Sequence, residues 1–177
     1  MNFHQKRIIS IFLSISLLSA CLPIKTIEFS EFKEPEPEIY VSIMPAVLEY
    51  FFFRNQAVLS GDLNTFYQRY PELEFGTDIE KGINTESRFI SNMHGLDPID
   101  GNIHPAYYEK IKVHQSETGV QVLIHGMELY LLKNAQGEFS ESGGEFELVL
   151  FMRQEGDLWQ VYQTDEVTLQ EWKGLER

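Results

Sequence analysis

Apolar residues in the first half of the chain recur with a helical period. Within residues 44–59 they follow the i, i+3, i+4, i+7 spacing of an amphipathic helix, at positions Met44, Val47, Leu48, Phe51, Phe52 and Leu59. Ser42 is the expected N-cap of this helix, with Pro45 in its first turn. Gly61 is its expected end.

Two shorter helices are predicted next. Asp62 is the expected N-cap of one that ends at Pro71. The other is predicted over residues 80–94, closed by Gly95. Residues 95–106 carry Pro and Gly without a regular period and are predicted to be a loop.

From residue 107 the period changes to two, which is typical of strands. Four strands are predicted, at residues 107–115, 120–133, 145–153 and 158–165. Residues 116–119 and 154–157 are expected turns, and the Gly-, Ser- and Glu-rich residues 136–144 an expected loop. Helices followed by hairpin-connected strands predict an α+β domain with an antiparallel sheet.

This order of elements resembles the nuclear transport factor two-like (SnoaL-like) family over residues 42–170. Its most specific part is Phe146-Glu147-Leu148-Val149-Leu150-Phe151 followed by Gly156-Asp157-Leu158-Trp159-Gln160-Val161. The resemblance implies N-terminal helices packed on a curved antiparallel sheet, a cone-like barrel with a pocket inside. Some members of that family are enzymes that perform acid–base chemistry on small apolar molecules, and many others only bind or associate. Fold therefore does not choose the function.

The first twenty residues have the three-part pattern of a secretory signal peptide. Lys6 and Arg7 precede the uncharged run 8–20, which as a helix spans about 20 Å, short of a bilayer core of about 30 Å. Leu18-Ser19-Ala20-Cys21 resembles the lipobox of bacterial lipoproteins, in which the cysteine after the cleavage site carries a diacylglycerol. This resemblance implies that Cys21 is the lipidated residue. The alternatives are a cleaved soluble precursor and an uncleaved anchor.

The predicted organisation is a signal peptide at residues 1–20, a lipidated cysteine and acidic tether at residues 21–40, and one α+β domain at residues 41–173. The run Lys33-Glu34-Pro35-Glu36-Pro37-Glu38 combines proline stiffness with like charges, which extends a chain. An ordered N-terminal strand is the alternative. The net charge is −13, and removal of residues 1–20, which hold two basic and no acidic residues, lowers it to −15. Such a charge argues against nucleic acid as a partner and against direct contact with anionic headgroups.

Glu128 and His125 are the candidate catalytic residues. Glu128 lies within the largely apolar run 122–132, where desolvation would raise its pKa and suit it to proton transfer. In a regular strand the two side chains face opposite sides, and a bulge at Gly126 would bring them to the same face. The alternatives, which we favour, are an exposed or ion-paired Glu128 and a histidine satisfied in the core or at its rim.

Tyr50, Phe53 and Tyr67 are candidate pocket residues, since the aromatic run 50–53 covers more than one helix face. Core packing is the alternative, and we favour it. The chain has no CxxC pair, no HxH or HxxxH spacing, and none of the glycine-rich nucleotide or nucleophile motifs. We therefore expect neither a metal nor a cofactor.

Three functional hypotheses follow. The favoured one is an extracytoplasmic lipoprotein, held by lipid on the cell membrane or outer membrane, whose domain binds a small apolar ligand or a protein partner without catalysis. Leu22 follows Cys21 in place of aspartate, which by the lipoprotein resemblance favours the outer membrane. The second is a cyclase- or isomerase-type enzyme with His125 and Glu128 converging in a closed apolar pocket. The third is self-assembly of two copies through the open sheet face.

Overall fold

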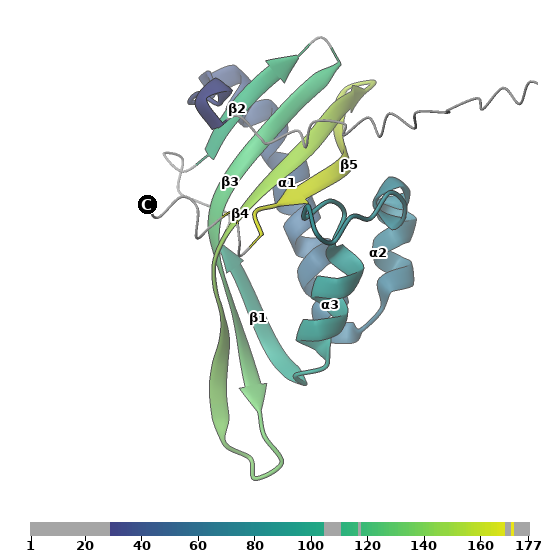
Figure 1. Cartoon of the computed structure of the whole chain (residues 1–177), viewed down its shortest axis with the longest axis vertical. Helices are drawn as coiled ribbons and strands as arrows, with labels where there is room; N and C mark the ends of the chain where they lie inside the picture. The colour runs from purple at the N-terminus through teal and green to yellow at the C-terminus, as the bar shows by residue number, and fades with distance from the viewer. Residues whose placement is uncertain (1–28, 105–110, 117, 169–170, 172–177) are drawn as a thin grey trace, which may run out of the picture.

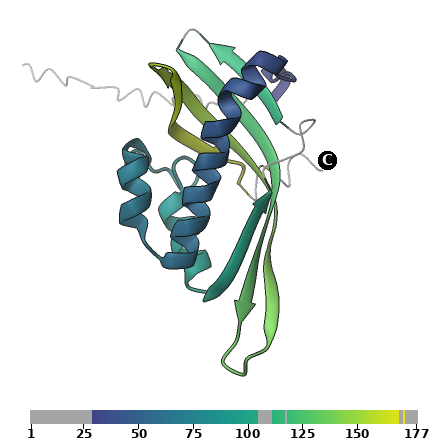
Figure 2. The same cartoon turned by 180° about the vertical axis from the view of Figure 1, so that it is seen from behind.

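The computed structural model describes residues 29–104, 111–116, 118–168 and residue 171. Within these ranges three α-helices precede the strands: α1 (Pro37–Ser60), α2 (Leu63–Arg69) and α3 (Glu86–His94). The strands are β1 (Pro98–His104), β2 (Ile111–Ser116), β3 (Gly119–Lys133), β4 (Phe139–Glu155) and β5 (Leu158–Glu166), and short 3₁₀ turns occur at Phe29–Glu31 and Pro71–Glu74. α1 runs across one face of the sheet, and α2 and α3 lie beside the C-terminal half of α1 (Figures 1 and 2). The predicted α+β class is confirmed.

α1 begins earlier than predicted. Pro37 occupies its first turn, where the missing N–H has no intrahelical acceptor to lose. Ser42 therefore lies inside the helix and is not its N-cap: its hydroxyl donates to the Ile39 carbonyl oxygen at 2.8 Å and accepts from Trp159 Nε1 at 3.2 Å. Pro45 is also internal, on the exposed side. The predicted end at Gly61, with φ of 72°, is confirmed.

The buried face of α1 differs from the predicted face. Its buried residues are Ile43, Val47, Tyr50, Phe51, Arg54, Ala57 and Val58. Leu48 and Phe52, predicted to be in the core, are 51% and 58% exposed. Because residues 50–53 are all aromatic, periodicity alone does not choose which of them face inward. The position of the sheet and of the other helices makes that choice.

α2 matches the prediction, and α3 is shorter than predicted. Asp62 Oδ1 accepts a 3.1 Å hydrogen bond from the Thr65 amide, which caps α2. α3 begins only at Glu86, because the preceding residues form a turn in which Gly82 has a φ of 78°. Ile83, next in the chain, makes bridge pairings with Asp78 and with the end of β5, which holds it extended.

The strands form one antiparallel sheet in the order β1-β3-β4-β5, and β2 also pairs with β3. β1 pairs with residues 127–132 of β3 and β2 with residues 119–124, so the two strands share one edge of β3. Two loop predictions are wrong, because β1 lies within residues 95–106 and β4 begins at Phe139, inside residues 136–144. Neither segment alternates in hydrophobicity, and both gain their hydrogen bonds from pairing with the long β3 strand.

The sheet is curved and open. Among the described residues no pairing joins β5 to β1 or β2, so the cone-like barrel implied by the resemblance does not close. The β3–β4 hairpin extends well past the helices (Figure 1). Of the predicted first strand, residues 107–110 lie outside the described residues, and β2 accounts for the remainder.

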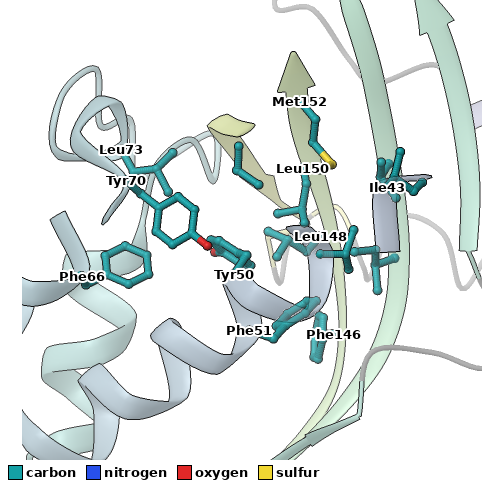
Figure 3. Close-up of a cluster of buried hydrophobic side chains, with 14 of the residues drawn as sticks. Ile43, Tyr50, Phe51, Phe66, Tyr70, Leu73, Phe146, Leu148, Leu150 and Met152 are labelled. Atoms are coloured by element: carbon teal, nitrogen blue, oxygen red, sulfur yellow. The ribbon is translucent and has the colours of Figure 1, made fainter. Parts of the chain in front are cut away.

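The main core lies between the helices and the inner face of the sheet. Figure 3 shows the rings of Phe66 and Tyr70, at α2 and its C-terminal end, beside the Tyr50 ring of α1, and the side chains of Leu148, Leu150 and Met152 of β4 on the other side of α1. The centroids of the Tyr50 and Tyr70 rings are 5.7 Å apart, in an edge-to-face arrangement that aromatic pairs favour. The interior of the curved sheet is thus largely filled by the chain's own side chains.

The residues before α1 belong to the fold. Lys33 and Val113 exchange backbone hydrogen bonds of 3.0 and 2.7 Å, which adds a bridge to the edge of β2. Phe32 is buried on the outer sheet face against Leu123 and Val149. Residues 29–40, which the sequence analysis placed in the tether, therefore pack on the domain.

The predicted signal peptide and the predicted lipidation site Cys21 lie outside the described residues. No helix among those described is both long and apolar enough to cross a membrane.

Candidate binding site

A hollow of about 800 Å³ lies between α3 and the end of β5. Residues from both elements and from the turn before α3 line it, among them Ile79, Thr85, Arg88, Phe89, Glu166 and Thr168. We call it the α3–β5 hollow. It exists because β5 ends beside the turn 78–83, where the Glu166 amide donates to the Gly82 carbonyl oxygen at 3.0 Å.

Arg54 lies directly behind the wall of this hollow. It is 1% exposed, and its Cζ atom is 3.8 Å from the centroid of the Phe89 ring, within cation–π range. Its Nη2 atom is 3.4 Å from Glu166 Oε2. The Nε and Nη1 atoms have no hydrogen-bond partner among the described residues. α1, α3 and β5 thus meet at one buried guanidinium.

Glu86, at the start of α3, is a second buried polar group nearby. Its Oε1 atom accepts a 2.9 Å hydrogen bond from the Tyr50 hydroxyl and another from the Thr164 hydroxyl. Its Oε2 atom has no partner among the described residues. Burial raises the pKa of this carboxyl, partly offset by the hydrogen bond from Thr164. This carboxyl is therefore less readily ionised than that of an exposed glutamate.

Glu128 has a buried carboxyl group, which lies on the inner face of β3. It is 8% exposed, and its Oε2 atom lacks a partner within the described part of the chain. Burial raises its pKa, and the nearby positive charge of Arg54 lowers it in part. Glu128 is therefore buried and not exposed, and its role in proton transfer stays a prediction.

His125 does not join Glu128. The pairing of β3 with β4 continues without a shift through Gly126, so the bulge that the acid–base hypothesis requires is absent and the two side chains face opposite sides. His125 lies on the outer face, with Nε2 3.0 Å from Glu145 Oε2. This is the rim histidine of the alternative interpretation, and the convergent pair is wrong.

The three predicted pocket residues do not share one cavity. Tyr50 is completely buried and bonded to Glu86, and Tyr67 is half-buried. Phe53 lines a smaller hollow of about 260 Å³ between α1 and α2, together with Phe52 and Phe66. None of the three lines the α3–β5 hollow.

The sequence analysis missed Arg54 and Glu86 as site residues, and it did not connect Glu166 with Arg54. Arg54 has a recognisable signal, because it stands four residues after Tyr50 and seven after Val47, on the apolar face of α1. Glu86 stands at the start of a helix and Glu166 at the end of a strand, where acidic residues are common. Nothing in the neighbouring sequence marks either side chain as inward-facing. No group of His, Cys, Asp and Glu in the described ranges is arranged to hold a metal ion.

Comparison with known proteins adds only distant structural likenesses. No protein-family model matches the chain, and no curated protein matches it in sequence. Aln2 from a Streptomyces species overlays with a TM-score of 0.49 at 13% identity, over 82% of this chain and all of that one. A proposed dehydratase from the NTF2-like family of Streptomyces avermitilis overlays with a TM-score of 0.44 at 14% identity, over 75% of this chain and 99% of that one. At these scores neither protein carries an argument about what this chain does.

Proposed function

We propose that this protein is an extracytoplasmic lipoprotein whose domain binds a small organic molecule in the α3–β5 hollow, without catalysing a reaction. The hollow carries the proposal. Its volume of about 800 Å³ is within the range of small-molecule sites, about 300–1,000 Å³. It combines apolar side chains with a few polar ones, and a buried charged group lies behind its wall.

We also propose that the domain is NTF2-like. The support is the order of its elements: a long helix and two shorter ones, then long antiparallel strands that curve around the first helix. The hairpin between β4 and β5 carries the glycine turn followed by Trp159 and Val161, on which the sequence resemblance rests.

The contacts favour binding over catalysis. The acid–base hypothesis needed His125 and Glu128 together, and these two side chains are on opposite sheet faces. Glu128 on its own has the raised pKa of a general acid, and it lines neither of the two hollows. The interior that would hold a substrate is occupied by Tyr50, Phe51 and Phe146.

The lipid anchor on Cys21 is supported by the lipobox resemblance of Leu18-Ser19-Ala20-Cys21. Residues 21–28 reach at most about 28 Å when extended, at about 3.5 Å per residue. A lipid on Cys21 would therefore keep the domain near the membrane, while its negative charge opposes contact with anionic headgroups. Self-assembly through the outer sheet face stays a prediction.

Native mass spectrometry of the full chain, released from its host in mild detergent, tests the binding proposal. We expect a co-purifying molecule of discrete mass. Asn92, on the exposed lining of the hollow, is replaced by tryptophan to fill it, and Asn64→Trp on the exposed side of α2 is the matched control. The adduct should disappear in Asn92→Trp and persist in Asn64→Trp. An adduct that survives Asn92→Trp, or a chain that never carries one, contradicts the proposal.

A further inference from the structure

Arg54 is a buried cation whose hydrogen-bonding capacity is mostly unused. Of its three guanidinium nitrogens only Nη2 has a partner in the described part of the chain, and Nε and Nη1 have none. Buried charged donors without acceptors are unfavourable, and native structures nearly always pair them with protein, water or ligand. A carboxylate from outside the chain that pairs with Nη2 and with one of these nitrogens at once, in a bidentate contact, would therefore stabilise this position.

Glu166 lies between the α3–β5 hollow and Arg54, so its position marks how an outside acceptor would reach the guanidinium. Its carboxylate lines the α3–β5 hollow, with 25% of the side chain exposed, and its Oε2 atom reaches Arg54 Nη2 at 3.4 Å. That distance is longer than the 2.7–2.9 Å typical of a charge-assisted hydrogen bond. A carboxylate that enters through the hollow can thus reach the same guanidinium, and the present contact is weak enough to be replaced.

We propose that Arg54 anchors the carboxylate of the hollow's ligand, an organic monocarboxylic acid, and that Glu166 is an internal carboxylate which this ligand displaces. The inference rests on the proposed function, because it names the ligand class of the same hollow. The apolar body of the acid packs against Ile79, Phe89 and Val167, and the displaced Glu166 turns toward the open side.

The charges around Arg54 agree with an anionic ligand. Glu86 and Glu128 are its other acidic neighbours, and burial raises the pKa of both carboxyls, while the positive charge of Arg54 lowers it in part. A ligand carboxylate that takes the place of the Glu166 carboxylate beside Arg54 adds no buried net charge. Arg88 adds a positive charge to the lining and Glu80 a negative one.

Calorimetric titration of the full chain in mild detergent, with detergent-only titrations subtracted, tests the ligand class. The probes are 4-phenylbutyrate, 4-phenylbutan-1-ol and 4-phenylbutylamine, which share one apolar body and differ in charge. We expect the acid to bind most tightly. Arg54→Met should weaken its binding about tenfold or more, through loss of a charge-assisted hydrogen bond. Glu166→Gln should tighten it about fivefold, because the competing carboxylate is gone.

Glu145→Gln is the matched control, since it removes the same charge from the outer sheet face and should change the affinity less than about twofold. The inference is overturned if Glu166→Gln leaves the affinity for the acid unchanged or lowers it. If Arg54→Met does not fold, the result for Glu166→Gln alone tests the inference. It is also overturned if the amine or the alcohol binds best, or if none of the three binds. In those cases the proposed function still stands if native mass spectrometry shows a bound molecule that Asn92→Trp removes.

Discussion

The hydroxyl of Tyr50 donates a 2.9 Å hydrogen bond to the Oε1 atom of Glu86, across 36 positions of sequence. Both residues are buried, and the bond joins the middle of α1 to the first turn of α3. Thr164 of β5 donates to the same oxygen, so one carboxyl ties two helices to the sheet. This contact stabilises the wall between the core and the α3–β5 hollow.

Tyr50→Phe is expected to lower the free energy of unfolding by about 1–2 kcal/mol, because Glu86 loses one of two donors while the ring stays packed. Urea denaturation followed by circular dichroism measures the change. Tyr162→Phe, at a half-buried ring on β5, is the control and should change stability by less than about 0.5 kcal/mol. Equal effects of the two variants would mean that the bond to Glu86 contributes nothing.

Asp165 gives the chain a pH-dependent stability. It pairs across from Val149 on the outer sheet face, and burial, with the nearby Glu171 carboxylate, raises its pKa to about 7. Below about pH 3 the folded and unfolded chains both bind this proton. Between about pH 3 and pH 7 the unfolded chain releases it while the folded chain keeps it, so stability falls as pH rises and the fall is complete above about pH 7.

Asp165→Asn is therefore expected to leave the free energy of unfolding nearly unchanged at about pH 3 and to raise it by about 1–2 kcal/mol at about pH 8. The gain is smaller than the full pKa difference implies, because the side chain is only partly buried. Thermal denaturation across this pH range measures it. Asp157→Asn, at an exposed position in the β4–β5 turn, should show no such pH-dependent gain, and the same gain in both would contradict the assignment to Asp165.

The turn before α3 can approach the end of β5 closely because residue 82 is a glycine, and a larger residue would not fit there. Its φ is 78°, and an added Cβ atom would overlap the carbonyl oxygen of Glu166. Gly82→Ala should therefore destabilise the fold by about 2–3 kcal/mol, through backbone strain and displacement of β5.

Gly156→Ala separates the two causes, since Gly156 has a φ of 64° but nothing within 4 Å of the added Cβ. It should cost about 1 kcal/mol, the strain alone. Chemical denaturation of both variants is the measurement. Equal losses would show that the contact with Glu166 has no effect.

The lipid anchor is tested by Cys21→Ser. Membranes of the expression host are washed without detergent, and the intact mass of the processed chain is measured. We expect the wild-type chain in the pellet with an acylated N-terminus and the Cys21→Ser chain without acyl chains and largely in the supernatant. Thr26→Ser, outside the lipobox, should behave as wild type. A Cys21→Ser chain that stays as firmly in the pellet would exclude the lipid as the anchor.

The sequence pattern predicted the elements whose stabilising contacts lie between residues close together in the chain. Asp62 caps α2 as expected, because the capping bond to Thr65 spans only three residues. The strand at residues 120–133 follows its long apolar run, the strand at residues 158–165 follows its alternation, and the turn between β4 and β5 follows its glycine. β1 and the first part of β4 were missed because pairing with a distant strand, and not their own composition, makes them extended.

The candidate site depended on contacts that no local pattern contains. Arg54 and Glu166 are 112 positions apart, and Tyr50 and Glu86 are 36 apart. The sequence alone determined the α+β class, the buried character of the run around Glu128, and the resemblance that marks Cys21. Only the tertiary structure decided which face of an all-aromatic turn of α1 is buried, that His125 and Glu128 are separated, and that Arg54 lies behind the α3–β5 hollow. Periodicity reports the shape of one element, whereas a site forms where several elements meet.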